Sequence, residues 1–204
     1  NLGSGFKIAM RDLEIRGAGN LLGPEQHGHI AAVGFSLYCK LLDNAIKELQ
    51  GKKFERDEEV EIKLNIDAYI PDEYIGHSQQ KIEFYKKISK LKEEEDFLDL
   101  VDELIDRFGE PPLEVMNLIK VSQIRAIAIK VGINMIYEKR GYIYCKFVDQ
   151  NKLNREAIIA LIEKYPGNLR IKTGKETEIG VKTNQLEVLE KILTEYHGFS
   201  LSSQ

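Results

Sequence analysis

The sequence lacks tryptophan and has only two cysteines, Cys39 and Cys145, which stand on separate predicted elements. Two cysteines so far apart do not make a disulfide framework, and a zinc site built on them would need ligands of other kinds. No apolar run approaches the roughly 18–20 residues of a membrane span, and no signal segment opens the chain. We therefore expect a cytoplasmic protein with no membrane contact.

A nucleotide-binding loop is also missing. The sequence contains no GxxxxGKS or GxxxxGKT run, so it lacks the loop that cradles the phosphates of ATP and the hydroxyl that holds magnesium. His27 and His29 flank a glycine, but no cysteine or third histidine stands near them to complete a metal site. We therefore expect that this chain by itself is not an enzyme and holds neither a cofactor nor a metal.

The chain has little net charge. Its formal net charge is −4, and 30% of its 204 residues are charged. A slightly negative chain has no general attraction for DNA, which is a polyanion. Any contact with DNA must therefore be local. The length suffices for one large or two small domains.

Glycines crowd the stretch from Phe6 to Phe35, at positions 17, 19, 23, 28 and 34. Glycine costs backbone entropy in a helix, so we predict a helix over 6–15, a shaped loop, and a second helix over 35–49. The loop has three interpretations: a structural turn, a phosphate-binding loop, or a stiff element that presents arginines to nucleic acid or to a neighbouring domain. The second fails for two reasons. After Gly17 and Gly19, the next glycine is at position 23, one residue too late for GxGxxG, and the loop follows a helix rather than the strand that this motif requires.

From residue 60 onward, the spacing of apolar residues predicts an α+β fold. Residues 51–59 are charged and nearly free of apolar side chains, which predicts a linker. We predict strands at 60–68, 135–137, 142–148, 169–172 and 177–181. We predict helices at 78–91, 96–108, 111–131, 155–165 and 185–196, with Asp96 and Asn184 as N-caps. The second half forms two hairpin–helix units, which predicts a small antiparallel sheet with several packed helices.

The helix predicted at 96–108 carries the densest negative charge of the chain. Five carboxylates share one side of it, with Arg107 at the border: Asp99, Asp102, Glu103, Asp106 and Glu110. The apolar residues of this helix point largely elsewhere. Charged helix faces are usually only solvated. An acidic face would also repel DNA and fit a basic protein surface, and the residues alone leave both possibilities open.

Three blocks of sequence, in order, resemble one family. The run DLEIRGAGNLLG, continued by Gln26 and Gly28, resembles the TRG (translocation in RecG) motif of RecG-type helicases and bacterial transcription-repair coupling factors. The later runs VGFSLYCKLLDNAIKEL and ELIDRFGEPP resemble only the coupling factors. His27 stands where the family usually has serine, so no hydroxyl role is carried over to that position.

The resemblance implies a domain organisation and two sites. Residues 1–50 would be the TRG segment at the tail of the second motor lobe, 51–59 a linker, and 60–204 a C-terminal regulatory domain. The translocation element would comprise Arg11, Arg16, Gly17, Gly19, Gln26 and Gly28. An intramolecular regulatory interface at Glu103, Asp106 and Arg107 would pack on the N-terminal UvrB-like module of the same protein and cover the surface that recruits UvrA.

The resemblance further implies a fragment of an ATP-dependent DNA translocase that couples transcription to nucleotide excision repair. Its motor lobes, with ATP and magnesium, would precede Asn1, and we expect the chain to be part of a longer protein. The partners implied for the whole protein are RNA polymerase, UvrA and duplex DNA. Two alternatives remain at this point: a fragment of a RecG-type fork helicase, and a motor-free adaptor for protein interactions.

Overall fold

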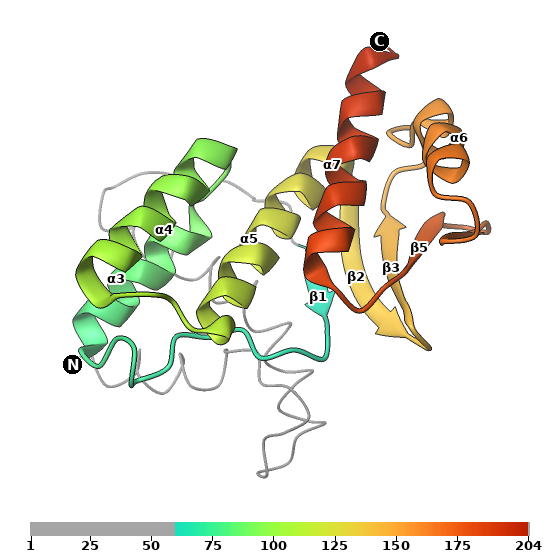
Figure 1. Cartoon of the computed structure of the whole chain (residues 1–204). Helices are drawn as coiled ribbons and strands as arrows, with labels where there is room; N and C mark the ends of the chain where they lie inside the picture. Colours follow the sequence, from blue (N-terminus) through green and yellow to red (C-terminus); the bar gives the residue numbers. More distant parts are fainter. Residues whose placement is uncertain (1–59, 204) are drawn as a thin grey trace. The chain divides into compact units, whose positions relative to one another are not determined.

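The computed structural model describes residues 60–203, so the predicted TRG segment and linker lie outside the described residues. Figure 1 shows the elements of this part in chain order. The helices are α3 (Ser78–Ser89), α4 (Glu94–Phe108), α5 (Leu113–Val131), α6 (Arg155–Lys164) and α7 (Leu186–Ser202). The strands are β1 (Glu61–Lys63), β2 (Ile133–Lys139), β3 (Tyr142–Phe147), β4 (Leu169–Lys172) and β5 (Glu178–Lys182). None of these helices is both long and apolar enough to cross a membrane.

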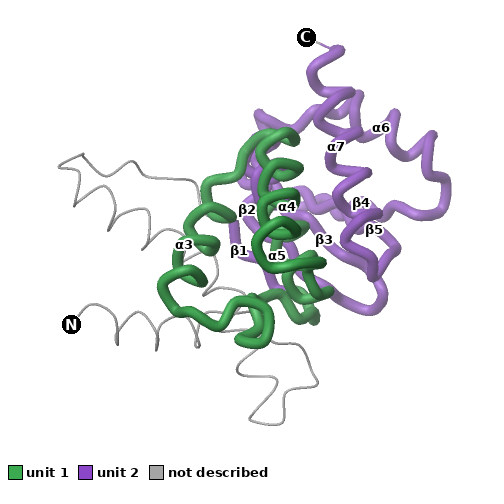
Figure 2. The backbone as a smooth tube through the Cα atoms, turned by 60° about the vertical axis from the view of Figure 1, so that its left-hand side comes forward, with its two compact units in different colours: residues 1–59, 64–122 green, residues 60–63, 123–204 purple. Residues whose placement is uncertain are grey.

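The region predicted as one regulatory domain contains two compact units, which Figure 2 colours separately. The described part of unit 1 is residues 64–122, and that of unit 2 is residues 60–63 and 123–203. Helix α5 therefore begins in unit 1, and its last turns belong to unit 2. The chain enters unit 2 through β1, leaves it to build unit 1, and returns to unit 2 along α5.

Unit 1 is built from α3, α4 and the first part of α5. Helix α4 begins with a capping box, in which Glu93 is the N-cap and its backbone N–H donates to the Asp96 carboxylate at 3.2 Å. Asp96, which we predicted as the N-cap, is therefore the third helical residue. The helix stops at Gly109, whose φ of 83° lies in the left-handed region that glycine tolerates. The core of the unit consists of apolar side chains from all three helices, among them Phe84, Ile88, Phe97, Leu100, Leu104, Leu118 and Val121.

Unit 2 is organised around a five-stranded sheet in the order β1-β2-β3-β5-β4. The pairs β2–β3, β3–β5 and β5–β4 are antiparallel, as the hairpin–helix pattern predicted. The β2–β3 hairpin turns at Arg140 and Gly141, which both have positive φ, as a tight two-residue hairpin turn requires. The α+β class is confirmed, but the sheet is mixed, because β1 joins β2 in parallel.

The two faces of the sheet differ, because successive residues of a strand point to opposite sides. One face is apolar and buried, with side chains that include Ile62, Ile136, Ile143, Cys145, Ile179 and Val181. Helix α7 covers this face, since the rings of Phe147 and Tyr196 lie 5.6 Å apart, and Figure 1 shows α7 in front of the strands. Burial raises the pKa of the Cys145 thiol to about 12.

Some predicted boundaries were wrong. The burial alternation expected over 60–68 is present, with Val60, Ile62, Leu64 and Ala68 buried, but only residues 61–63 pair with a neighbouring strand. Helix α7 continues past its predicted end at residue 196 to Ser202, because Gly198 does not interrupt it. Its N-cap is Gln185 rather than Asn184.

Candidate functional site

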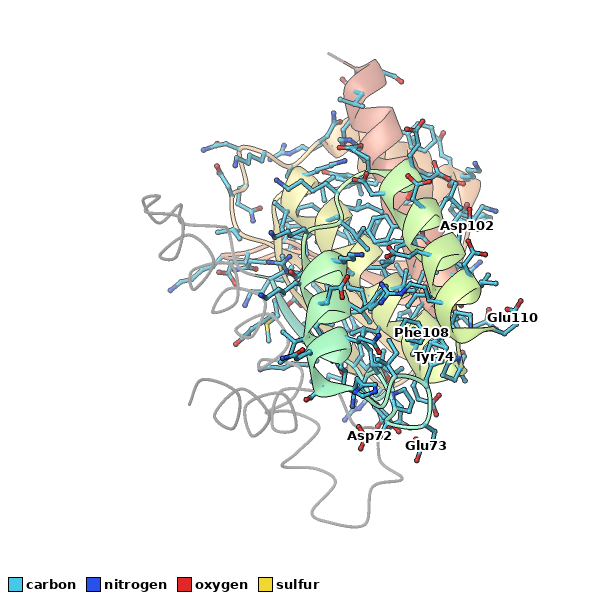
Figure 3. The ribbon with its side chains drawn as sticks, turned by 90° about the vertical axis from the view of Figure 1, so that its left-hand side faces the viewer. Asp72, Glu73, Tyr74, Asp102, Phe108 and Glu110 are labelled. Atoms are coloured by element: carbon cyan, nitrogen blue, oxygen red, sulfur yellow. The ribbon has the colours of Figure 1, made fainter. Side chains whose placement is uncertain are left out.

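The acidic side of α4 lies on the surface of unit 1. Asp99, Asp102 and Asp106 are exposed, and Figure 3 shows Asp102 on α4 and Glu110 projecting from the loop that follows it. The same side carries two large apolar residues, Leu98 and Ile105, which are 61% and 37% exposed. We had expected the apolar residues of this helix to point largely elsewhere, as the buried Phe97 and Leu104 do. The outward face of α4, defined by Leu98, Asp99, Asp102, Ile105 and Asp106, is therefore both acidic and apolar.

Glu103 and Arg107 are turned toward α3 instead. The Oε1 atom of Glu103 accepts hydrogen bonds from Lys87 Nζ at 2.7 Å and from Arg107 Nη1 at 3.3 Å. Glu83 Oε1 lies 3.3 Å from the same Lys87 nitrogen and 3.6 Å from the same Arg107 nitrogen. The hydrogen bond between Lys87 and Glu103 lowers the pKa of the carboxyl and raises the pKa of the amine. Two carboxylates and two cations thus form one network between α3 and α4.

Aromatic rings of α3 and α4 pack against the cations of this network. The rings of Phe84 and Phe108 meet edge to face at 5.4 Å, and Arg107 Cζ lies 5.0 Å and 5.2 Å from their centroids. Tyr74 packs on Phe108, and its hydroxyl donates to the Gly109 carbonyl at 2.8 Å (Figure 3). The attraction between the Arg107 cation and these two rings adds to the packing of α4 against α3. Of the three predicted interface residues, only Asp106 lies outside the network.

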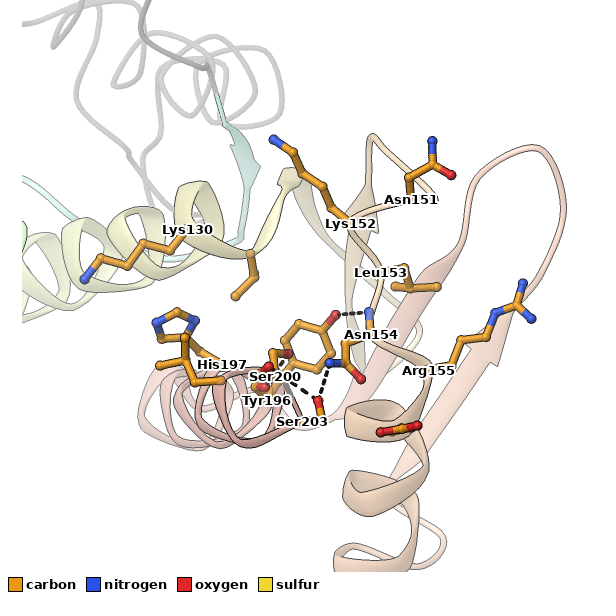
Figure 4. Close-up of a pocket in the computed structure, with 13 residues that line it drawn as sticks. Lys130, Asn151, Lys152, Leu153, Asn154, Arg155, Tyr196, His197, Ser200 and Ser203 are labelled. Carbon is orange, nitrogen blue, oxygen red and sulfur yellow. Dashed lines mark hydrogen bonds between the residues drawn. The ribbon is translucent and has the colours of Figure 1, made fainter.

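Unit 2 has a shallow hollow of about 630 Å³ beside the start of α6 and the end of α7. In Figure 4, the side chains of Lys130, Lys152 and Arg155 extend in different directions. The backbone N–H of Asn154 donates to the Tyr196 hydroxyl at 3.0 Å, so polar groups in the hollow bond one another. A catalytic site needs groups that converge on one point, and this hollow does not supply them. Within residues 60–203, no cluster of three or more His, Cys, Asp or Glu side chains could hold a metal ion.

The second face of the unit 2 sheet gathers tyrosines and cations. The ring of Tyr144 on β3 stacks on Tyr137 of β2 at 5.3 Å and on Tyr142 at 6.0 Å. From β4, Arg170 Cζ lies 4.2 Å from the Tyr142 ring centroid, and Lys172 Nζ lies 4.1 Å from the Tyr144 centroid. We call these residues the tyrosine–cation cluster.

Sequence analysis missed this cluster because its members come from three strands. The signal in the sequence is the two-residue spacing of Tyr142 and Tyr144, and of Arg170 and Lys172, which places each pair on one side of a strand. The predicted TRG residues Arg11, Arg16, Gly17, Gly19, Gln26 and Gly28 all lie outside the described residues.

Comparison with known proteins identifies the family of this chain. The model of the TRCF domain family matches residues 64–158. The transcription-repair-coupling factor of Staphylococcus haemolyticus (strain JCSC1435) is 44% identical over 191 residues, which cover 92% of this chain. The chain belongs to the family of transcription-repair coupling factors. The factor of Staphylococcus aureus (strain USA300) is 43% identical over 193 residues and also covers 92% of the chain.

The chain spans 16% of the length of these two coupling factors. A crystal structure of the C-terminal domain of transcription-repair coupling factor resembles it with a TM-score of 0.65 and 25% sequence identity. That match covers 74% of this chain and 100% of the other. The prediction that this is the C-terminal part of a coupling factor is confirmed, and the matches favour the coupling factors over the RecG-type helicases.

Proposed function

We propose that residues 60–204 regulate a transcription-repair coupling factor by docking the outward face of α4 on the N-terminal UvrB-like module of the same protein. Docking would cover the surface that recruits UvrA, until engagement of RNA polymerase and duplex DNA favours the released state. One observation carries this proposal: Leu98 and Ile105 are exposed among carboxylates on one helix face. Apolar residues inside a polar rim are typical of protein–protein interfaces.

Within this proposal, the three predicted interface residues have different roles. Asp106 lies on the outward face and would contact a basic partner directly. Glu103 and Arg107 act indirectly, because their bonds to Lys87 and Glu83 hold α4 on α3. A substitution of Glu103 would therefore change the position of the helix as well as its charge, so Asp106 gives the cleaner test.

The experiment measures UvrA binding to the full-length coupling factor. Asp106→Ala and Leu98→Ala should each weaken docking and raise the affinity for UvrA, by about fivefold or more. Glu163→Ala, which removes an exposed carboxylate from α6 of unit 2, is the matched control and should leave UvrA binding unchanged. If UvrA affinity stays the same in both α4 variants, the outward face of α4 is not the switch.

We also propose that residues 1–50 pass the motion of the motor lobes on to DNA. Support comes from the 191-residue alignment, which is too long for residues 60–204 alone and so includes part of the TRG segment. A guanidinium such as Arg16 can hold a carboxylate or phosphate by two parallel bonds and change partners between two states. ATP and magnesium belong to the motor lobes in this proposal, and the chain alone should not hydrolyse ATP.

Arg16→Ala in the whole protein tests this part of the proposal. The variant should still hydrolyse ATP, because the arginine acts after hydrolysis, but it should no longer displace stalled RNA polymerase. Both activities are measured on the same preparation. Loss of ATP binding itself would show that Arg16 supports folding rather than motion.

A further inference from the structure

We propose that the face of the unit 2 sheet that carries the tyrosine–cation cluster binds single-stranded DNA. Strand register places six basic residues on this face: Lys63, Lys139, Lys146, Arg170, Lys172 and Lys182. The same registers place two acidic residues on it, Glu61 and Glu178, and Glu176, just before β5, forms an ion pair with Lys146 at 2.5 Å. The whole chain has a net charge of −4, so this face is a local concentration of positive charge. A polyanion is the partner that such a surface attracts.

The tyrosines form a row that suits flat ligands. The planes of Tyr137 and Tyr144 differ by 21°, and those of Tyr142 and Tyr144 by 29°. Tyr144 lies over Gly180, where a Cβ atom would stand 2.6 Å from its ring, so glycine is what allows this close approach. Tyr144 itself is only 3% exposed, whereas Tyr137 and Tyr142 remain partly accessible. The accessible rings at the two ends of the row are those that unpaired bases could reach.

Arg170 adds a planar cation to the row. Its guanidinium carbon lies 4.2 Å from the centre of the Tyr142 ring, and the residue remains exposed. An arginine held in this way can stack on a base and bind a phosphate at the same time. Aromatic rings on strands with cations between them are how open sheets bind single-stranded nucleic acids. The cluster therefore offers both base stacking and phosphate contacts.

The hydroxyl groups of the cluster supply no contact that would select RNA. The Tyr137 hydroxyl donates to the Glu178 carboxylate, at 3.0 Å and 2.9 Å from its two oxygens. The Tyr144 hydroxyl accepts a hydrogen bond from Arg170 Nη1 at 3.4 Å. With these two hydroxyls engaged, the rings bind bases through their faces and do not select for the 2′-hydroxyl of ribose. A duplex hides base faces, and an acidic protein would need the cations but not the row of rings.

The test is fluorescence anisotropy with the 204-residue chain and a labelled oligothymidylate of about 12 nucleotides. Arg170→Glu combined with Lys172→Glu should weaken binding by about tenfold or more. Arg155→Glu combined with Lys191→Glu makes the same change in charge at two exposed positions of unit 2 away from this face, and should change the affinity by about twofold at most.

Tyr142→Leu should weaken binding about fivefold or more, while Tyr142→Phe should bind like the unchanged chain. Circular dichroism confirms that each variant is folded.

Three competing ligands complete the test. Oligouridylate should bind no more tightly than oligothymidylate, and a duplex of the same length should bind more weakly. The proposal is overturned if the Arg170–Lys172 variant binds as before, if the control variant loses as much affinity, or if the duplex binds equally well. Tighter binding of oligouridylate would reassign the face to RNA. Concentration-dependent dimers that disappear in the Arg170–Lys172 variant would assign it to a second copy of the chain.

Discussion

Glu103 is paired with both cations of the α3–α4 network. It accepts hydrogen bonds from a lysine of α3 and from Arg107 one turn further along its own helix. Side chains of this network are still about one-third exposed, so water screens the charges and each pair contributes little by itself. The network therefore sets the relative position of the two helices more than it stabilises them.

The pKa of Glu103 gives a prediction for acid stability. Its carboxyl has a folded-state pKa below the unfolded value of 4.5, chiefly because Lys87 donates to it. The ionised form is thus favoured by folding, and this contribution is present above pH 4.5 and lost as the pH falls through the folded-state pKa. Glu103→Gln should therefore lower the free energy of unfolding by about 0.5 kcal/mol at pH 7, and the difference should disappear below the folded-state pKa.

Urea denaturation at neutral pH and in acid measures this difference. Asp99→Asn, on the exposed side of the same helix, is the control and should change stability less than Glu103→Gln at pH 7. An equal destabilisation by Glu103→Gln at both pH values would show that the residue acts through packing and not through its charge.

At the scale of elements, local patterns predicted most helices and hairpins. Helix α6 was expected at residues 155–165 and occurs at Arg155–Lys164, because its apolar spacing lies within the segment and Asn154 caps it directly before its first residue. The parallel pairing of β1 with β2 was not predicted. It joins Ile62 to Ile136, and the spacing of apolar residues within one segment does not indicate so distant a contact. The tyrosine–cation cluster escaped prediction for the same reason: three strands must pair before its residues meet.

We expect that unit 2 folds only in fragments that keep strand β1 and the elements β4, β5 and α7. A chain cut to residues 64–158, the range of the TRCF domain match, keeps the described part of unit 1. It loses β1, β4, β5 and α7, and only the β2–β3 hairpin of the sheet remains. An isolated hairpin is marginally stable at best, so we expect unit 2 to be unfolded in this fragment.

The denaturant dependence of unfolding tests this expectation. Because less surface is buried, the fragment 64–158 should unfold with a clearly lower m-value than residues 60–204. Residues 60–204 should keep the near-ultraviolet signal of the stacked tyrosines, which the shorter fragment should lose. A preserved tyrosine signal in 64–158 would show that β1, β4 and β5 are dispensable.

At the scale of the whole molecule, charge is divided between the two units. The outward face of α4 in unit 1 is acidic, whereas the tyrosine–cation face in unit 2 is basic. The net charge of −4 averages these two surfaces and hides both. The sequence located the acidic face because it lies on a single helix, and it could not locate the basic one.

The buried thiol of Cys145 can be used to measure how often unit 2 opens to solvent. Its thiol is fully buried beneath the helices of unit 2, and its pKa of about 12 keeps it protonated at neutral pH. Because only the thiolate reacts with alkylating reagents, modification must wait until unit 2 opens to solvent. In a chain in which Cys39 is replaced by serine, Cys145 carries the one remaining thiol, and the rate at which it is alkylated measures how often unit 2 opens.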